Sequence, residues 1–143
     1  MVTGEALIDL DLSGLELAVL SACETGLGDV AGGEGTFGLQ RAFHLAGARD
    51  VVCSLWKVPD EPTAALMAEF YRNLWEKDLP PVESLRQAQL TIYRNPGKIR
   101  ELAAGFRGKF ERVPGAAEVG PADPGGTAHP LKWAAFTLSG LGR

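Results

Sequence analysis

The fold is decided by the stretch Leu17-Ala-Val-Leu-Ser-Ala-Cys-Glu-Thr-Gly26. Its first five residues form a short, nearly continuous apolar run, which is typical of a strand buried on both faces in a parallel sheet. Residues 23–38 contain six glycines. Because glycine holds regular structure only at an entropic cost, this stretch is predicted as a loop. Cys23 therefore lies where a buried strand gives way to a glycine-rich loop.

Strand-like and helix-like patterns alternate along the rest of the chain. Helices are predicted over 36–46, from near Asp60 to Trp75, and over 82–93, since apolar residues recur there at three- and four-residue intervals. Two further buried strands are predicted over 51–56 and 133–138. The segment 105–130 is rich in proline and glycine, and is predicted as a flexible loop or insertion.

The order strand, helix, strand, helix, helix, strand predicts an α/β fold with right-handed crossovers, in a single domain covering residues 1–143. A sheet of three strands is small for this class, because a parallel sheet needs both faces covered and usually has more strands. Only sixteen residues precede a first strand that has a central character. We therefore expect a partner segment of the sheet to lie outside this chain.

Composition and charge exclude several classes of function. The net charge is −4 and the basic residues are scattered, so no nucleic-acid surface is expected. No apolar run reaches the roughly 18 residues that span a membrane, and the N-terminus lacks the pattern of a signal peptide. These features favour a cytoplasmic location. His44 and His129 share no metal-ligand spacing with the cysteines, so neither a metal nor a cofactor is expected.

The two cysteines, Cys23 and Cys53, are predicted as free thiols. A thiol at the carboxyl end of a strand is held by a rigid element and remains open to a substrate, which suits a nucleophile. Cys23 has this position, although a buried cysteine that acts as a small apolar residue is the alternative. Cys53 lies in the middle of a predicted strand, where the second interpretation is favoured.

Asp60 follows the neighbouring strand on the same edge of the predicted sheet. Its carboxylate has the chemistry to hold a basic substrate side chain near Cys23 through a charge-assisted bond. The alternative is a helix N-cap formed by Asp60 or Glu61.

The run Gly33-Glu-Gly35-Thr-Phe-Gly38 has the spacing of a dinucleotide-binding loop and opens a helix. Roughly a dozen residues separate it from the strand, however, whereas a dinucleotide site needs its glycines directly after the strand. A mobile loop over Cys23 explains these glycines better than a nucleotide site.

A succession of blocks, in order from about residue 3 to 140, resembles the CHAT domains, which are similar to caspases and separases and often follow arrays of TPR repeats. The blocks are Leu17-Ala-Val-Leu-Ser-Ala-Cys-Glu-Thr-Gly26, Gly33-Glu-Gly35, Arg41-Ala-Phe-His-Leu-Ala-Gly-Ala48, Ser54-Leu-Trp56 with Asp60, Phe70-Tyr71, His129-Pro130 and Trp133-Ala-Ala-Phe136.

The resemblance implies a caspase-like three-layer sandwich with a mostly parallel sheet flanked by helices. It implies that Cys23 is the nucleophile of a cysteine peptidase and that its backbone N–H helps to form an oxyanion hole. The run Trp56-Lys-Val-Pro-Asp60 resembles the separase stretch whose aspartate binds a P1 arginine. Asp60 is therefore a substrate-binding residue by resemblance, with cleavage expected after Arg or Lys.

The chain departs from the family in one respect that matters for catalysis. In this fold the general-base histidine lies in a His-Gly motif at the end of the strand before the cysteine strand, and no histidine precedes Leu17. The strands that usually come first are absent too, so the chain corresponds to the C-terminal half of the domain. His44 is interpreted as partly exposed helix surface and His129 as structural. Without a base, the thiol is expected to keep a pKa near the ordinary value of about 8.5.

Three hypotheses follow. The chain is the Cys23 half of a cysteine endopeptidase, inactive alone, which acts on a protein or peptide substrate once another segment, such as the N-terminal half of the domain or a TPR-containing segment, supplies the base. Alternatively, it is a non-catalytic interaction module or a truncated remnant of a TPR–CHAT protein. A nucleotide-binding domain is the third and weakest interpretation.

Overall fold

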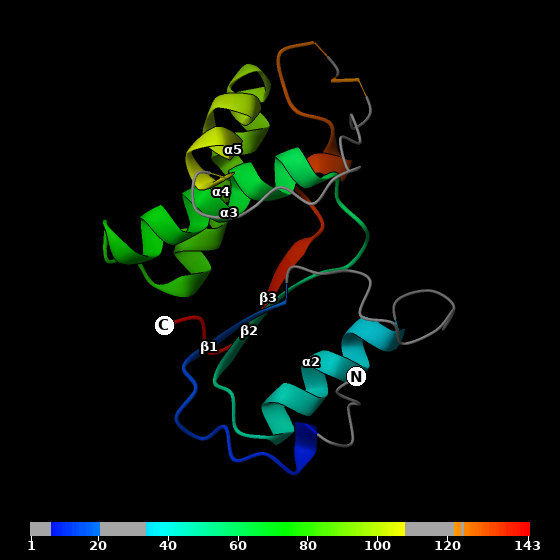
Figure 1. Cartoon of the computed structure of the whole chain (residues 1–143), viewed down its shortest axis with the longest axis vertical. Coiled ribbons are helices and arrows are strands. Elements are labelled where there is room, and N and C mark those ends of the chain that lie inside the picture. Colours follow the sequence, from blue (N-terminus) through cyan, green and yellow to red (C-terminus); the bar gives the residue numbers. More distant parts are fainter. Residues whose placement is uncertain (1–6, 21–33, 108–121, 124) are drawn as a thin grey trace. The chain divides into compact units, whose positions relative to one another are not determined.

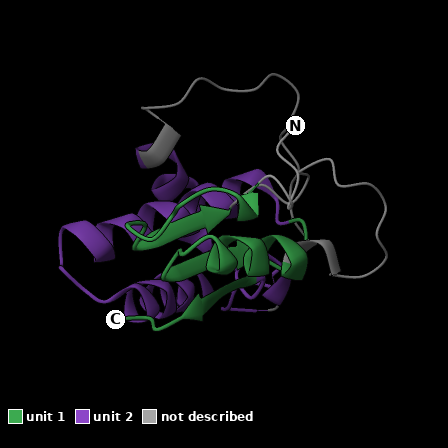
Figure 2. Cartoon of the chain, turned by 90° about the horizontal axis from the view of Figure 1, so that it is seen from below, with its two compact units in different colours: residues 1–57, 136–143 green, residues 58–135 purple. Residues whose placement is uncertain are grey.

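The computed structural model describes residues 7–20, 34–107, 122, 123 and 125–143 (Figure 1). The elements that it bounds are β1 (Leu17–Leu20), α2 (Glu34–Leu45), β2 (Asp50–Ser54), α3 (Asp60–Trp75), α4 (Pro81–Arg94), the 3-10 turn η1 (Pro96–Lys98), α5 (Ile99–Arg107), the 3-10 turn η2 (Pro130–Lys132) and β3 (Phe136–Gly140). The chain divides into two compact units, residues 1–57 with 136–143 and residues 58–135 (Figure 2).

Unit 1 is built on a three-stranded sheet of order β1-β2-β3. β1 pairs with β2 in parallel and β3 pairs with β2 antiparallel. All five residues of β2 are buried, and its β-branched pair Val51 and Val52 suits a central strand with both faces covered. The predicted α/β class is confirmed, since this sheet and the helices α2 to α5 are what a partial caspase-like fold would contain.

Helix α2 packs its small residues inward and ends in a tight cap. Ala42 and Ala46 are buried, and Phe43 packs against the cluster formed by Ala18, Ala48 and Val51. The Gly47 N–H donates to the His44 carbonyl at 3.0 Å and the Ala48 N–H to the Phe43 carbonyl at 2.9 Å. This is the Schellman pattern, and it requires the positive φ of 110° that Gly47 adopts. The predicted stop at Gly47 therefore has a specific backbone cause.

Unit 2 is a helical layer in which α3 packs against both α4 and α5. Leu66 and Phe70 of α3 are fully buried, as are Ala88 and Ile92 of α4. One polar link joins the first two helices, because the buried Asn73 side-chain amide donates to the Ser84 carbonyl at 3.2 Å. The three- and four-residue spacing of these apolar side chains explains why the sequence predicted α3 and α4 correctly.

The largest differences from the sequence prediction are helix α5 and the start of β3, and β2 also ends at Ser54, where a strand to Trp56 was predicted. Helix α5 was not predicted, because it is short and borders the segment rich in glycine and proline, and it extends through Arg107 into the region expected to be loop. β3 begins at Phe136 and not at Trp133, since Trp133 and Ala134 donate their N–H groups to the Pro130 carbonyl and close the turn η2. An apolar run does not by itself distinguish a strand from a buried turn.

The helices of the described segments include none that is long and apolar enough to cross a bilayer.

Replacing Gly47 by alanine should lower the free energy of unfolding by about 1–3 kcal/mol, since the residue is held at positive φ. A Cβ there would also meet the Ser13 backbone nitrogen at 2.7 Å. Urea denaturation followed by circular dichroism measures the change. Gly14→Ala is the matched control in the facing loop, because nothing lies within 4 Å of its Cβ position. Equal stabilities for the two variants would refute the cap.

Candidate active site

Cys23, the predicted nucleophile, lies outside the described residues, and the structure fixes the strand that leads to it. β1 ends at Leu20, which lies opposite Cys53 in the parallel pairing with β2. The carboxyl ends of β1 and β2 therefore share one edge of the sheet in unit 1. Reactive groups in open α/β sheets collect beyond this edge.

Asp60 is the first residue of α3, in unit 2, and its side chain is exposed. The predicted N-cap role is wrong, because the cap position is Pro59 and no side chain caps the helix. Within the described residues, no hydrogen bond or ion pair engages the Asp60 carboxylate. Its neighbour Glu61 instead forms an ion pair with Arg100 at 3.5 Å. A carboxylate in the first helical turn is favoured by the helix dipole and remains available to a ligand.

Cys53 is a free cysteine in β2 with 1% of its surface exposed. Its Sγ lies 3.6 Å from the Thr137 hydroxyl of β3. A thiol this deeply buried packs as a small apolar side chain and is protected from reagents. Cys53 therefore provides an internal reference for the reactivity of Cys23.

His44, in the last turn of α2, links that helix to β3. The interpretation of His44 as a partly exposed helix surface residue therefore left out this contact. Its Nδ1 lies 3.0 Å from the Ala48 carbonyl, which can only accept, so Nδ1 carries a proton. Its Nε2 lies 2.8 Å from the Ser139 hydroxyl, within hydrogen-bond distance. Both ring nitrogens are thus engaged in contacts within unit 1.

The position of His44 also separates it from the edge that leads to Cys23. Ala48 precedes β2, and Ser139 pairs with Val51, the second residue of β2. His44 therefore lies at the edge where β1 and β2 begin, whereas Cys23 follows in sequence the end of β1. This geometry supports a structural role for His44.

His129 caps the turn η2 in unit 2. Its ring Nδ1 accepts the Leu131 backbone N–H at 3.2 Å, and the backbone N–H of His129 donates to an Asp123 side-chain oxygen at 2.9 Å. The Trp133 indole N–H closes the same segment by donating to the Ala128 carbonyl at 3.2 Å. His129 and Trp133, from the last two blocks of the family resemblance, therefore stabilise the segment that precedes β3.

An ion pair supports this cap. Lys132 Nζ donates to the Asp123 oxygen at 2.7 Å. Partial burial disfavours the charged carboxyl, but the hydrogen bonds from Lys132 and from the His129 backbone, with the positive charge of Lys132, leave the pKa of Asp123 below its ordinary value. Sequence patterns do not indicate this pair, because Asp123 lies in a stretch without periodicity.

A second anchor that the sequence did not indicate is Asp50. Its side chain is 1% exposed, and Oδ1 accepts the Gly142 N–H at 2.7 Å. Arg49 beside it bonds the Arg143 carbonyl and approaches Glu16 at 3.6 Å. A charged residue before an apolar run usually indicates an exposed turn, and only the tertiary pairing reveals burial.

No group of three or more histidine, cysteine or acidic side chains in the described ranges could hold a metal ion. The candidate residues are thus described separately: in unit 1 the structure gives the sheet edge at which β1 ends, three residues before Cys23, and in unit 2 it gives the exposed side chain of Asp60.

His44→Ala should lower the free energy of unfolding by about 1 kcal/mol, because the link between α2 and β3 is lost. Ser139→Ala should cost a similar amount, and a double-mutant cycle in urea should show that the two losses are coupled. Arg41→Ala, an exposed position one turn earlier, is the control and should change stability by less than about 0.5 kcal/mol.

The same variants test whether His44 activates Cys23. The rate of Cys23 alkylation by iodoacetamide at pH 7 should be the same in His44→Ala and the parent protein. A severalfold slower rate in His44→Ala, with no change in Ser139→Ala, would contradict the structural role.

Comparison with known proteins agrees with the blocks found in the sequence. The CHAT domain family matches residues 1–141. The chain is also 30% identical over 140 residues to mouse tetratricopeptide repeat protein 28, and this match covers 98% of the chain but only 4% of that much longer protein. No solved structure matches the chain. A family match over nearly every residue, on the same blocks that surround Cys23 and Trp133, shows that the chain belongs to the CHAT domain family.

Proposed function

We propose that this chain carries the nucleophile half of a caspase-like cysteine endopeptidase, with Cys23 as the nucleophile and Asp60 in the pocket for a basic P1 side chain. The observation that carries the proposal is the parallel pairing of β1 with the fully buried β2. A rigid strand then leads to Cys23, and three residues of chain span at most about 11 Å beyond Leu20. A nucleophile needs this combination of rigid support and access.

The proposed reaction is thiol-mediated acyl transfer. The Cys23 thiolate attacks the scissile carbonyl, and backbone N–H groups stabilise the oxyanion. The carbon–nitrogen bond breaks as a general acid protonates the leaving amine, and water then hydrolyses the thioester to release the acid and regenerate the thiol. Asp60 contributes by holding the guanidinium or ammonium group of the substrate.

The base must come from another segment. The chain contains only His44 and His129. Ring nitrogens of both are engaged in local contacts, with Ala48 and Ser139 for the first and Leu131 for the second. We infer that the histidine and further strands are supplied by an N-terminal half of the domain or by a partner chain, in a cytoplasmic protein.

The name of the mouse relative supports a TPR-containing segment as the associated module. Arrays of helical repeats present extended concave surfaces that bind other proteins, so they suit the recruitment of a substrate or a regulator.

A non-catalytic interaction module is the second candidate. The contacts of the two histidines favour this second candidate, since every described contact of the His44 and His129 rings fits a purely structural role. In that case Cys23 would react as an ordinary surface thiol, and Asp60 would have no influence on it.

An arginyl chloromethyl ketone at pH 7 distinguishes these candidates, with the adduct mapped by mass spectrometry. We expect alkylation of Cys23 and not of the buried Cys53. Asp60→Ala should slow this reaction at least about fivefold, because the basic group loses its charge-assisted partner. Alkylation by iodoacetamide, which carries no basic group, should be unchanged in the same variant.

Glu61→Ala is the matched control, since its carboxylate is the next along α3 and is engaged with Arg100. It should leave both rates unchanged. If Cys23 reacts with the arginyl reagent at the rate of an ordinary thiol, whether or not Asp60 is present, the chain is catalytically silent alone and the proposed role of Asp60 in the P1 pocket fails.

A further inference from the structure

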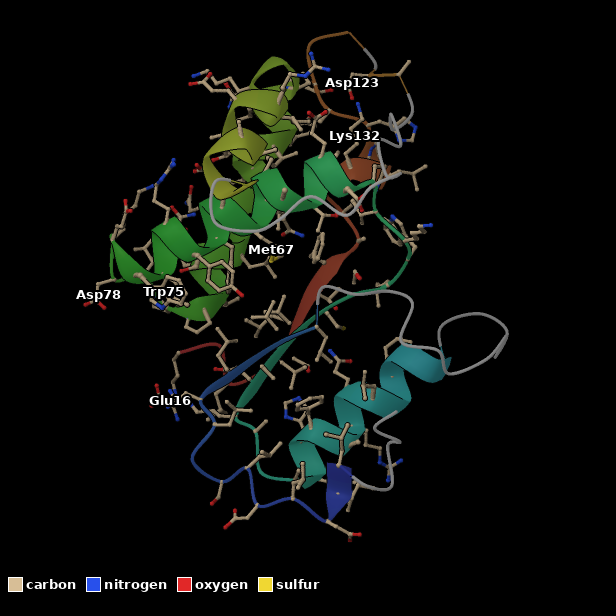
Figure 3. All side chains as sticks on the ribbon, viewed as in Figure 1. Glu16, Met67, Trp75, Asp78, Asp123 and Lys132 are labelled. Carbon is tan, nitrogen blue, oxygen red and sulfur yellow. The ribbon has the colours of Figure 1, made fainter. Side chains whose placement is uncertain are left out.

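Two aromatic rings stack on the last turns of α3, and one of them faces solvent. The rings of Tyr71 and Trp75 lie 4.6 Å apart at an angle of 18°. Trp75 is 73% exposed, although tryptophan is mostly buried in folded proteins. Figure 3 shows its side chain near the end of α3, close to the loop that carries Asp78. An exposed, ordered indole is an unusual surface feature, because it leaves a large apolar area in water.

The stack is anchored in the core of unit 2. Tyr71 contacts Phe70 with ring centroids 5.3 Å apart, and Phe70 is fully buried. Burial raises the pKa of Tyr71, so its phenol remains neutral at pH 7. Because the i,i+4 spacing on the helix and the Tyr71 ring hold Trp75 in place, a ligand that packs on it immobilises few additional side chains.

The charges around this pair favour a cationic ligand. Residues 69–78 carry three carboxylates, Glu69, Glu76 and Asp78, against two cations. Both cations are engaged within this stretch, and Arg72 bonds Glu69 and approaches Glu76 at 4.0 Å. Lys77 donates to the Asn73 side chain at 2.7 Å. In the described part of the chain the Asp78 carboxylate has no partner, and Glu76 is 73% exposed.

We propose that Tyr71 and Trp75 form a docking site for a basic segment of a protein partner. An arginine or lysine side chain of that segment packs on the exposed face of Trp75 by a cation–π contact, and the carboxylates of Glu76 and Asp78 balance its charge. Trp75 lies fifteen positions after Asp60 on α3, which is about 22 Å along the helix. The site is therefore distinct from the proposed P1 pocket, and it does not depend on peptidase activity.

The test uses the whole chain labelled with ¹⁵N and a blocked glycine–arginine peptide, with the citrulline version of the peptide as a neutral isostere. The chain has three tryptophans, and the cross-peak lost in Trp75→Phe assigns the Trp75 indole. We expect this cross-peak to move with the arginine peptide and to stay in place with the citrulline peptide. Trp75→Ala should weaken binding at least about fivefold, and Asp78→Asn about two- to fivefold.

Phe37→Ala is the control, because it removes an aromatic side chain of similar exposure, 60%, from the other unit. Its affinity for the peptide should equal that of the parent protein. Trp75→Phe keeps a stacked ring and should bind with intermediate affinity, and circular dichroism verifies that each variant is folded. An unmoved Trp75 cross-peak at millimolar peptide, equal binding of the citrulline peptide, or equal weakening by Phe37→Ala would each overturn the proposal.

Discussion

Unit 1 depends on the burial of β2 between two partner strands. β1 and β3 are hydrogen-bonded to β2 and not to each other, so the central strand sets the register of both. Its first residue, Asp50, binds the backbone of Gly142 after β3 from a buried position. Glycine is required at position 140, because its φ is 127° and a Cβ there would lie 2.3 Å from the Arg49 carbonyl and the Asp50 carboxylate. Backbone pairing and this carboxylate together fix the last strand.

The two edges of this sheet have different roles. At the edge where β1 and β2 begin, His44, Ser139 and Asp50 use their polar groups to join α2 and the C-terminal segment to the sheet. At the other edge β1 ends at Leu20, three residues before Cys23 in the sequence. Because the His44 ring bonds at the edge where β1 and β2 begin, it does not lie at the edge where β1 ends, three residues before the proposed nucleophile Cys23. This division is the physical reason for proposing a second segment as the source of the base.

Much of the fold could be predicted from the sequence, because periodic burial determines it. β1, β2, α2, α3 and α4 follow from apolar spacing, and the end of α2 follows from Gly47. α5 was missed, since it is short and borders a glycine- and proline-rich segment. The apolar run from Trp133 was predicted as strand, although its start is a turn.

The polar anchors of the sheet in unit 1 were less predictable, because they join residues far apart in sequence. His44 and Ser139 are separated by 95 positions, and Asp50 and Gly142 by 92. Spacing along the chain carries no information about such pairs. The position of Asp60 was predicted, but its N-cap role was not observed, because Pro59 occupies the cap. The prediction of Cys23 as nucleophile rests on the strand before it and on the family.

Hydrolysis of an arginine ester as a function of added imidazole tests the central claim most directly, because imidazole can replace a missing histidine base. The account predicts negligible turnover by the chain alone, and a rate that rises with imidazole in the parent protein but stays at the background level in Cys23→Ala. Rapid hydrolysis without imidazole would mean that the chain contains its own base. Equal imidazole-dependent rates with and without Cys23 would mean that Cys23 is not the nucleophile.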